Sequence, residues 1–274
     1  MRHFAAQQAL ATALARLDVV QAELPERAVQ LFTAQLHGLQ LEIWVASEDI
    51  AQAEQWMAER RGTLAEEEWA ELVIGYALLL AGQDSHAAAD EALREGLKHY
   101  PKNLALISQL AELAQLQGRS MQVIQLLRRA IRVAKAQDKP AVGLWVRLSG
   151  ACLHQMNEQA RKAADKAVEL AEAMQESEQT PLPMIRQLRL QARNALAQVE
   201  CQAQHFELAE TLFRAVLEEN PWFLPALQGL GHQQMQCGKI DEAVALFERI
   251  KQIDPAKGYS SLINARQFPE DEIT

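Results

Sequence analysis

The stretch that decides the fold is residues 221–255, which read PWFLPALQGLGHQQMQCGKIDEAVALFERIKQIDP. In its first half, apolar and small residues recur three and four positions apart, which predicts one face of a helix. These residues are Leu227, Leu230 and Gly231. Gly238 predicts the end of this helix, because glycine readily adopts the left-handed conformation that follows many helix C-termini.

The second half of the stretch predicts another helix that folds back on the first. Its apolar face carries Ala243, Phe247 and Ile250 at helical spacing. Pro255 ends it, because proline lacks the amide hydrogen that a helix interior needs. The stretch is therefore a helical hairpin, bounded by prolines that lie 34 positions apart, Pro221 and Pro255.

This spacing resembles the tetratricopeptide repeat, whose 34-residue pattern reads W-x2-L-G-x2-Y, then A-x3-F, then P. The positions that match it are Leu227, Leu230, Gly231, Gln234, Ala243, Phe247 and Pro255. Gln234 is the unusual member, because the pattern has a large aromatic residue at this place. Leu227 is a conservative departure.

The same template recurs upstream, and several copies in tandem are far more specific than one. The best upstream copy consists of Ile107, Leu110, Ala111, Ala114, Gly118, Val123, Leu127 and Ala130. Looser copies are built on Trp69, Leu72, Val73 and Tyr76, on Leu144, Leu148 and Ala151, and on Leu196, Ala197, Ala209 and Phe213. A degenerate copy contains Leu41, Trp44, Ala53 and Met57.

The resemblance implies an all-α fold, a right-handed superhelix of five to six helical hairpins over residues 36–255. Residues 1–35 are expected to cap the array at its start, within helices at about 2–22 and 26–46, and residues 256–274 to form a C-terminal capping helix and tail. No Ser/Gly-rich linker interrupts the chain, so we expect one continuous array over residues 1–274.

Composition and charge narrow the function. The net charge is −9, and Lys and Arg alternate with Glu and Asp along the helices, so a nucleic-acid partner is disfavoured. No apolar stretch is long enough to span a membrane, and the three cysteines lack CxxC spacing. We therefore expect a cytoplasmic protein with reduced thiols.

The sequence offers no pattern for catalysis, so we expect no enzyme, no cofactor and no metal. Gly229 and Gly231 could suggest a nucleotide loop, but no strand precedes them, which favours close helix packing. No histidine has a His or Cys three or four positions away, as a local metal pair would need. Cys152 and Cys201 occupy equivalent places in adjacent repeats, about 10 Å apart, which exceeds disulfide reach.

In this family, the first helix of each hairpin lines a concave groove that holds a peptide or a partner helix. By that resemblance, the groove positions here are Trp145, Ser149, Asn194, Gln198, Gln228, His232 and Gln236. Their amides can both donate and accept hydrogen bonds, as an extended backbone requires. Trp145 is either an interface anchor or a residue that packs on the next hairpin. We expect a protein or peptide partner that is uncharged or basic and not strongly acidic.

Three functions fit these observations, and the first is an adaptor that gathers proteins. The second is the regulatory region of a larger enzyme, because the tail resembles the segment that joins tetratricopeptide arrays to sulfotransferase domains in some bacterial proteins. The residues of that likeness are Gly258, Tyr259, Leu262, Asn264, Arg266, Phe268 and the acidic 270–272. The third is the helical effector domain of a transcriptional regulator. The adaptor is favoured.

Overall fold

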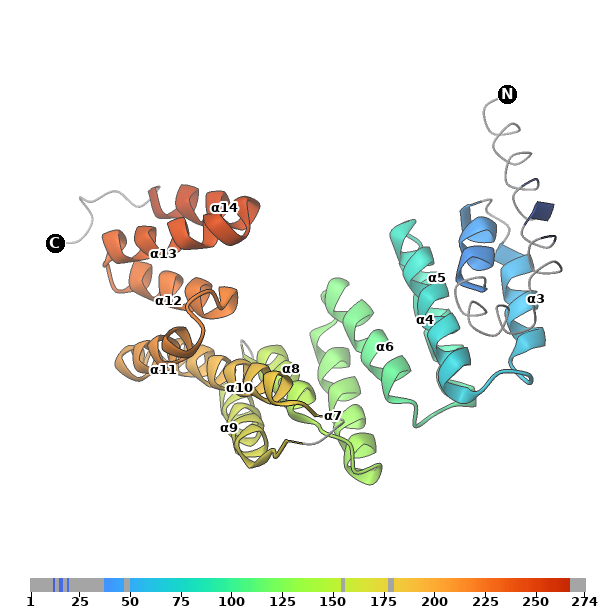
Figure 1. Cartoon of the computed structure of the whole chain (residues 1–274), viewed down its shortest axis with the longest axis horizontal. Coiled ribbons are helices and arrows are strands. Elements are labelled where there is room, and N and C mark those ends of the chain that lie inside the picture. Colours follow the sequence, from blue (N-terminus) through green and yellow to red (C-terminus); the bar gives the residue numbers. More distant parts are fainter. Residues whose placement is uncertain are drawn as a thin grey trace. The chain divides into compact units, whose positions relative to one another are not determined.

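The computed structural model describes residues 37–46, 50–153, 156–176 and 180–266, together with residues 12, 15, 16 and 19. These residues are predominantly α-helical, which confirms the all-α fold (Figure 1). The chain divides into two compact units, residues 1–133 and 134–274, and each is described by itself. The single continuous array stays a prediction.

The first unit is a succession of helices that pack on their neighbours in sequence. A helix over residues 37–46 is followed by α3 (Ile50–Arg60), α4 (Glu66–Gly82), α5 (His86–His99), α6 (Leu104–Leu116) and α7 (Ser120–Ala136), which ends just past the unit. Helix α4 packs on α5 and on α6. The predicted helix at 26–46 is confirmed over 37–46, and most of the predicted helix at 2–22 lies outside the described residues.

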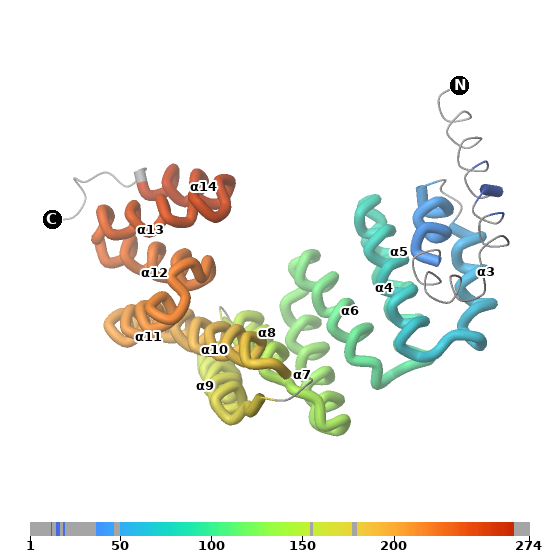
Figure 2. Tube along the Cα trace, in the orientation of Figure 1, coloured from blue at the N-terminus to red at the C-terminus, as the bar shows by residue number. Residues whose placement is uncertain are grey.

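The second unit continues the same pairing (Figure 2). It contains α8 (Val142–Cys152), α9 (Asn157–Ala173), α10 (Leu182–Gln202), α11 (Phe206–Glu219), α12 (Leu224–Gln236), α13 (Ile240–Ile253) and α14 (Pro255–Arg266). Helix α10 contacts both α8 and α12, so the first helices of successive hairpins form a row. Helix α14 confirms the short helix predicted after the last repeat. Within the described part of the chain, no helix is long and apolar enough to cross a membrane.

The turns inside four of the hairpins, α4–α5, α6–α7, α10–α11 and α12–α13, share one backbone conformation. After α12, the amide of Lys239 donates to the Gln234 carbonyl at 2.8 Å, and the amide of Gly238 donates to the Met235 carbonyl at 3.0 Å. These two bonds define a Schellman motif, which requires a left-handed residue just past the helix. The residues with positive φ at this place are Asp84, Gly118, Gln204 and Gly238. Glycine therefore fills only two of the four equivalent turns.

Small residues allow the helices of the second unit to approach closely. A Cβ atom added to Gly229 would lie 2.5 Å from Cζ of Phe213, and one added to Gly231 would collide with the ring of Phe247. Both phenylalanines are fully buried. The two glycines are thus packing residues in the interior of α12, as the sequence indicated, and do not form a nucleotide loop.

Ion pairs join each hairpin to the next. Asp90 on α5 pairs with Arg94 and, at 2.6 Å, with Arg119 in the turn of the following hairpin. Burial acts to raise the pKa of Asp90, but hydrogen bonds from these two arginines outweigh it and lower the pKa. The second unit repeats this arrangement with Glu210, Arg214 and Lys239. The link is therefore a recurring element of the repeat.

Candidate functional site

The two predicted groove residues on α8 lie against the core. Trp145 is half-buried and packs against a cluster formed by Val142, Ala167, Ala171 and Ala192. Ser149 is only 1% exposed. In the burial pattern of α8, Trp145 and Ser149 correspond to Leu227 and Gly231 of the last repeat, which are core positions. Trp145 therefore packs on the neighbouring helices, and its role as an interface anchor stays a prediction.

The predicted residues on α10 and α12 lie in another setting. Gln198 and Gln228 are half-buried, while His232 and Gln236 are exposed. The thiol of Cys201 on α10 lies 4.0 Å from Oε1 of Gln236 on α12, so the two helices present these side chains next to each other. We call the set Gln198, Gln228, His232 and Gln236 the amide face.

Asn194 lies at the base of this row, one repeat length before Gln228. It is 6% exposed, and its Oδ1 atom has no hydrogen-bond partner in the described part of the chain. A buried amide oxygen without a donor costs roughly 1–3 kcal/mol. The fold thus keeps a hydrogen-bond acceptor at this position that nothing within it uses.

The surroundings of His232 favour its neutral form. Its ring lies 5.6 Å from that of Phe247, and burial lowers its pKa from the ordinary value of 6.5. Desolvation disfavours the imidazolium form, so the neutral ring dominates at pH 7. All four side chains of the amide face are therefore polar and neutral.

The described residues offer little for metal or thiol chemistry. They contain no group of three or more His, Cys, Asp or Glu residues that could hold a metal ion. In the described part of the chain, Cys152, Cys201 and Cys237 form no disulfide bond. Burial, with a smaller contribution from Cys237, raises the pKa of Cys201, which disfavours its reactive thiolate form.

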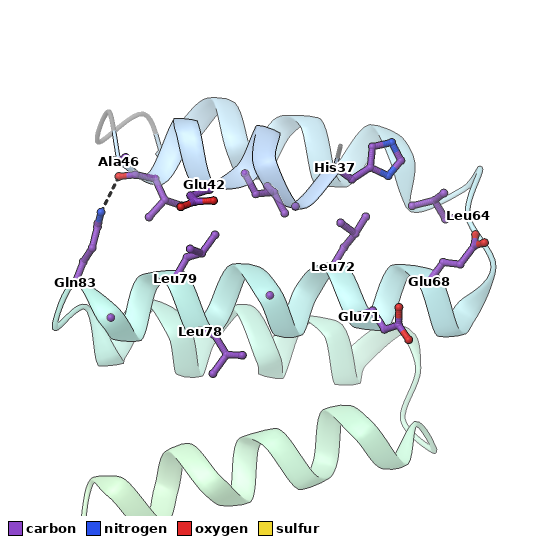
Figure 3. A pocket seen from close by; sticks show the side chains of 15 residues that line it. His37, Glu42, Ala46, Leu64, Glu68, Glu71, Leu72, Leu78, Leu79 and Gln83 are labelled. Carbon is purple, nitrogen blue, oxygen red and sulfur yellow. Dashed lines mark hydrogen bonds between the residues drawn. The ribbon is translucent and has the colours of Figure 1, made fainter. Parts of the chain in front are cut away.

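A cleft in the first unit escaped the sequence analysis (Figure 3). It has a volume of about 780 Å³ and lies between the helix over residues 37–46 and α4. Its lining is His37, Gly38, Leu41, Glu42, Val45, Ala46, Leu64, Glu68, Glu71, Leu72, Gly75, Leu78, Leu79, Gly82 and Gln83. One signal could have revealed it: α4 carries three consecutive leucines, Leu78 to Leu80, and a helix that is apolar on several faces needs more than one apolar neighbour.

Comparison with known proteins agrees with the repeat pattern. A family model described as tetratricopeptide repeat matches residues 200–265, from the end of α10 to α14. No curated protein matches the chain significantly. The likeness of the tail to sulfotransferase-linked arrays finds no support in these comparisons, and its residues 267–274 lie outside the described part of the chain.

Several solved structures share the fold at low sequence identity. A tetratricopeptide repeat protein from Parabacteroides merdae is 15% identical, with 87% of this chain and 94% of that chain covered and a TM-score of 0.58. TTC0263 of Thermus thermophilus is 14% identical, with 74% and 100% covered and a TM-score of 0.52. PilW, a type IV pilus biogenesis factor, is 16% identical, with 74% and 95% covered and a TM-score of 0.53. The family match identifies residues 200–265 as tetratricopeptide repeat, and the solved structures show that the described residues share this fold.

Proposed function

We propose that this protein is a non-catalytic scaffold that binds a peptide segment of a partner protein on the amide face of its second unit. Tetratricopeptide repeat domains generally mediate protein–protein interactions. The amide face lies on α10 and α12, which are first helices of their hairpins, the helices that the resemblance assigns to ligand binding.

The unpartnered acceptor of Asn194 is the observation that carries this proposal. A backbone amide of a ligand that reaches Asn194 would supply the missing donor and relieve the cost of leaving Oδ1 unpaired. Because Oδ1 of Asn194 is buried, its side chain has to rotate before a ligand can reach this atom. Gln198 and Gln228, at half-buried positions beside it, can then both donate to and accept from the same peptide backbone.

The chemistry of the face restricts the partner. Its four side chains are uncharged at neutral pH, and the whole chain carries a net charge of −9. Neither property favours a strongly acidic segment, because the chain would repel it without a local cation to compensate. An uncharged or basic extended peptide suits the site better.

A displayed library of random peptides, selected on the full chain, tests the proposal. Selected peptides should bind the variant Gln198→Ala/Gln228→Ala/Gln236→Ala at least about tenfold more weakly, because each lost hydrogen bond costs about 0.5–1.5 kcal/mol. Asn194→Ala should weaken binding by about 1 kcal/mol. Gln252→Ala, at an exposed position of α13, is the matched control and should leave binding unchanged. Peptides that bind the triple variant as tightly as the natural chain would remove the amide face from the proposal.

A further inference from the structure

The cleft of the first unit combines an apolar base with an exposed apolar edge. Leu41, Val45 and Leu72 are buried beneath it. Leu78, which also lines it, is 53% exposed. Leu79 and Leu64, which are half-buried, extend the apolar lining on either side of these residues, and contiguous apolar surface of this kind marks interaction sites. The cleft therefore offers more apolar surface than the fold itself uses.

The cleft is elongated along its two helices. Its lining on α4 runs from Glu68 to Gln83, about 22 Å at a rise of 1.5 Å per residue. On the opposite helix it runs from His37 to Ala46, about 14 Å. The hydrogen bond from Nε2 of Gln83 to the Val45 carbonyl, 3.0 Å long, joins the two walls at one end (Figure 3). Such a length matches three to four turns of a peptide helix.

Three glycines in the walls contact no other side chain at the position of a Cβ atom in the described part of the chain. A Cβ atom added to Gly38, Gly75 or Gly82 would meet no atom within 4 Å, and none of the three has a positive φ. Gly75 lies in the middle of α4, where glycine costs about 1 kcal/mol relative to alanine. By contrast, Gly231 is required by contact with a phenylalanine ring. Gly75 leaves the helix backbone open to close approach from the cleft side.

The rim of the cleft is acidic. Glu42, Glu68 and Glu71 line it, and all three are exposed. The Glu68 carboxylate accepts the amide of Ala65 at 3.3 Å, and in the described part of the chain neither Glu42 nor Glu71 forms an ion pair. Carboxylates beside an apolar groove attract a ligand that carries cations next to apolar side chains.

We propose that this cleft docks an amphipathic, basic helix of a partner protein. Leucine-like side chains on one edge of that helix would cover Leu72, Leu78 and Leu79, with its backbone close to Gly75. Lysine or arginine side chains flanking this edge would reach Glu42 and Glu71. This surface belongs to the first unit and is independent of the amide face, so the two proposals stand or fall separately.

A second copy of the chain is a weaker candidate for the occupant. Each copy carries a net charge of −9, so two copies repel each other at low ionic strength. The carboxylates of the rim require cations from the occupant. Charge complementarity therefore favours a partner of the opposite sign.

The test uses a fluorescent synthetic helix of leucine and lysine, with leucines three and four positions apart, titrated with the full chain. A scrambled peptide of the same composition and a peptide with glutamate in place of lysine are the ligand controls. We expect the amphipathic basic peptide to bind at least tenfold more tightly than either control. Its affinity should fall as salt is added, because exposed charges are screened.

Variants of the chain decide whether the binding occurs in the cleft. Gly75→Leu should weaken the peptide tenfold or more by filling the wall, whereas Gly150→Leu, at an exposed glycine of α8 with equally free space, should not. Glu42→Gln/Glu71→Gln should weaken it about two- to fivefold per carboxylate at low salt. The amide-face triple variant should bind it as the natural chain does.

Three results would overturn the proposal. The first is equal affinity of the Gly75→Leu variant and the natural chain. The second is equal affinity for the amphipathic and scrambled peptides, which indicates charge attraction alone. The third is a dimer in sedimentation that Gly75→Leu converts to a monomer, which identifies a second copy as the occupant. Circular dichroism of each variant verifies that the chain is folded.

Discussion

Replacing Gly231 with alanine probes the contact on which the last repeat depends. The substitution adds one methyl group in the interior of α12, at the crossing with α13. In an exposed helix, this change would stabilise the protein by about 1 kcal/mol, because alanine favours the helix. Here the added atom meets the ring of Phe247, and the outcome depends on whether that ring can move.

The geometry predicts that the steric clash with Phe247 outweighs the gain in helix propensity. The new Cβ would lie 3.0 Å or less from three atoms of the Phe247 ring, whereas carbon atoms in contact prefer about 3.5–4.0 Å. The ring is fully buried and packs with Ala243, Ile250 and Leu262, so it has no free space to enter. Overpacking of this kind costs about 1–3 kcal/mol. After the gain in helix propensity, we expect a net loss of up to about 2 kcal/mol.

Gly150→Ala is the matched control, because it adds the same methyl group in the same unit. A Cβ atom there would meet nothing within 4 Å, so this variant should gain up to about 1 kcal/mol. Urea unfolding followed by far-ultraviolet circular dichroism measures both changes as shifts of the midpoint at constant slope. Phe247→Leu should recover part of the loss in the Gly231→Ala background. If both alanine variants shift the midpoint in the same direction, the close crossing of α12 and α13 is not the reason for Gly231.

Three further substitutions test other features of the fold. Tyr76→Phe should leave stability unchanged or raise it by up to about 1 kcal/mol in thermal unfolding, because the buried hydroxyl has no hydrogen-bond partner in the described part of the chain. A clear loss of stability would contradict this. Gln204→Gly should raise the urea midpoint by the equivalent of about 0.5–1 kcal/mol, because Gln204 has a φ of 64°, a left-handed conformation that glycine adopts without strain. A lower midpoint would show that the Gln204 side chain stabilises the fold by more than this strain costs. Asp90→Asn should lower stability by about 0.5–1 kcal/mol at pH 7, because the lowered pKa of Asp90 means that its ionised form stabilises the fold. That difference should persist above about pH 4 and shrink as the pH falls through the folded pKa of Asp90, and a constant difference across acid-unfolding curves would exclude the ion pair as its cause.

The sequence was sufficient to predict the hairpins because their crossing residues are chemically distinctive. Gly231 faces the large ring of Phe247 where the two helices cross, and Leu230 lies beside it. All three are buried as expected. The turns were partly predictable. Gly118 and Gly238 indicated the left-handed residue, whereas Asp84 and Gln204 take the same conformation without a glycine to signal it. The neighbouring hydrogen bonds impose that conformation, and they depend on the folded repeat.

The register of α8 was not predictable for a related reason. The sequence analysis aligned Leu144, Leu148 and Ala151 with the core of the template. Leu148 is buried as expected, but Ser149 and Cys152 are buried in place of Leu144 and Ala151. Small and apolar residues occur all around α8, so a shift of one position leaves the pattern almost equally good. The contacts of α8 with α9 and α10 determine which register forms. Those contacts involve residues that are distant in sequence. As a result, Trp145, which the sequence analysis assigned to the groove, packs against the core.

One position near the end of the first helix of a hairpin takes no part in the core, and the two units fill it with different residues. In each first helix, the residue two places after the last template position lies outside the hairpin crossing. In the first unit that residue is Leu78 or Leu116, which are 53% and 79% exposed. In the second unit it is Gln202 or Gln236, both exposed. The fold tolerates either a leucine or an amide side chain at this position, because no core contact depends on it. Packing therefore does not explain why these first helices carry leucine in one unit and an amide in the other. The two proposed partner segments would explain it, because leucines favour an apolar helix edge and amides favour a polar backbone.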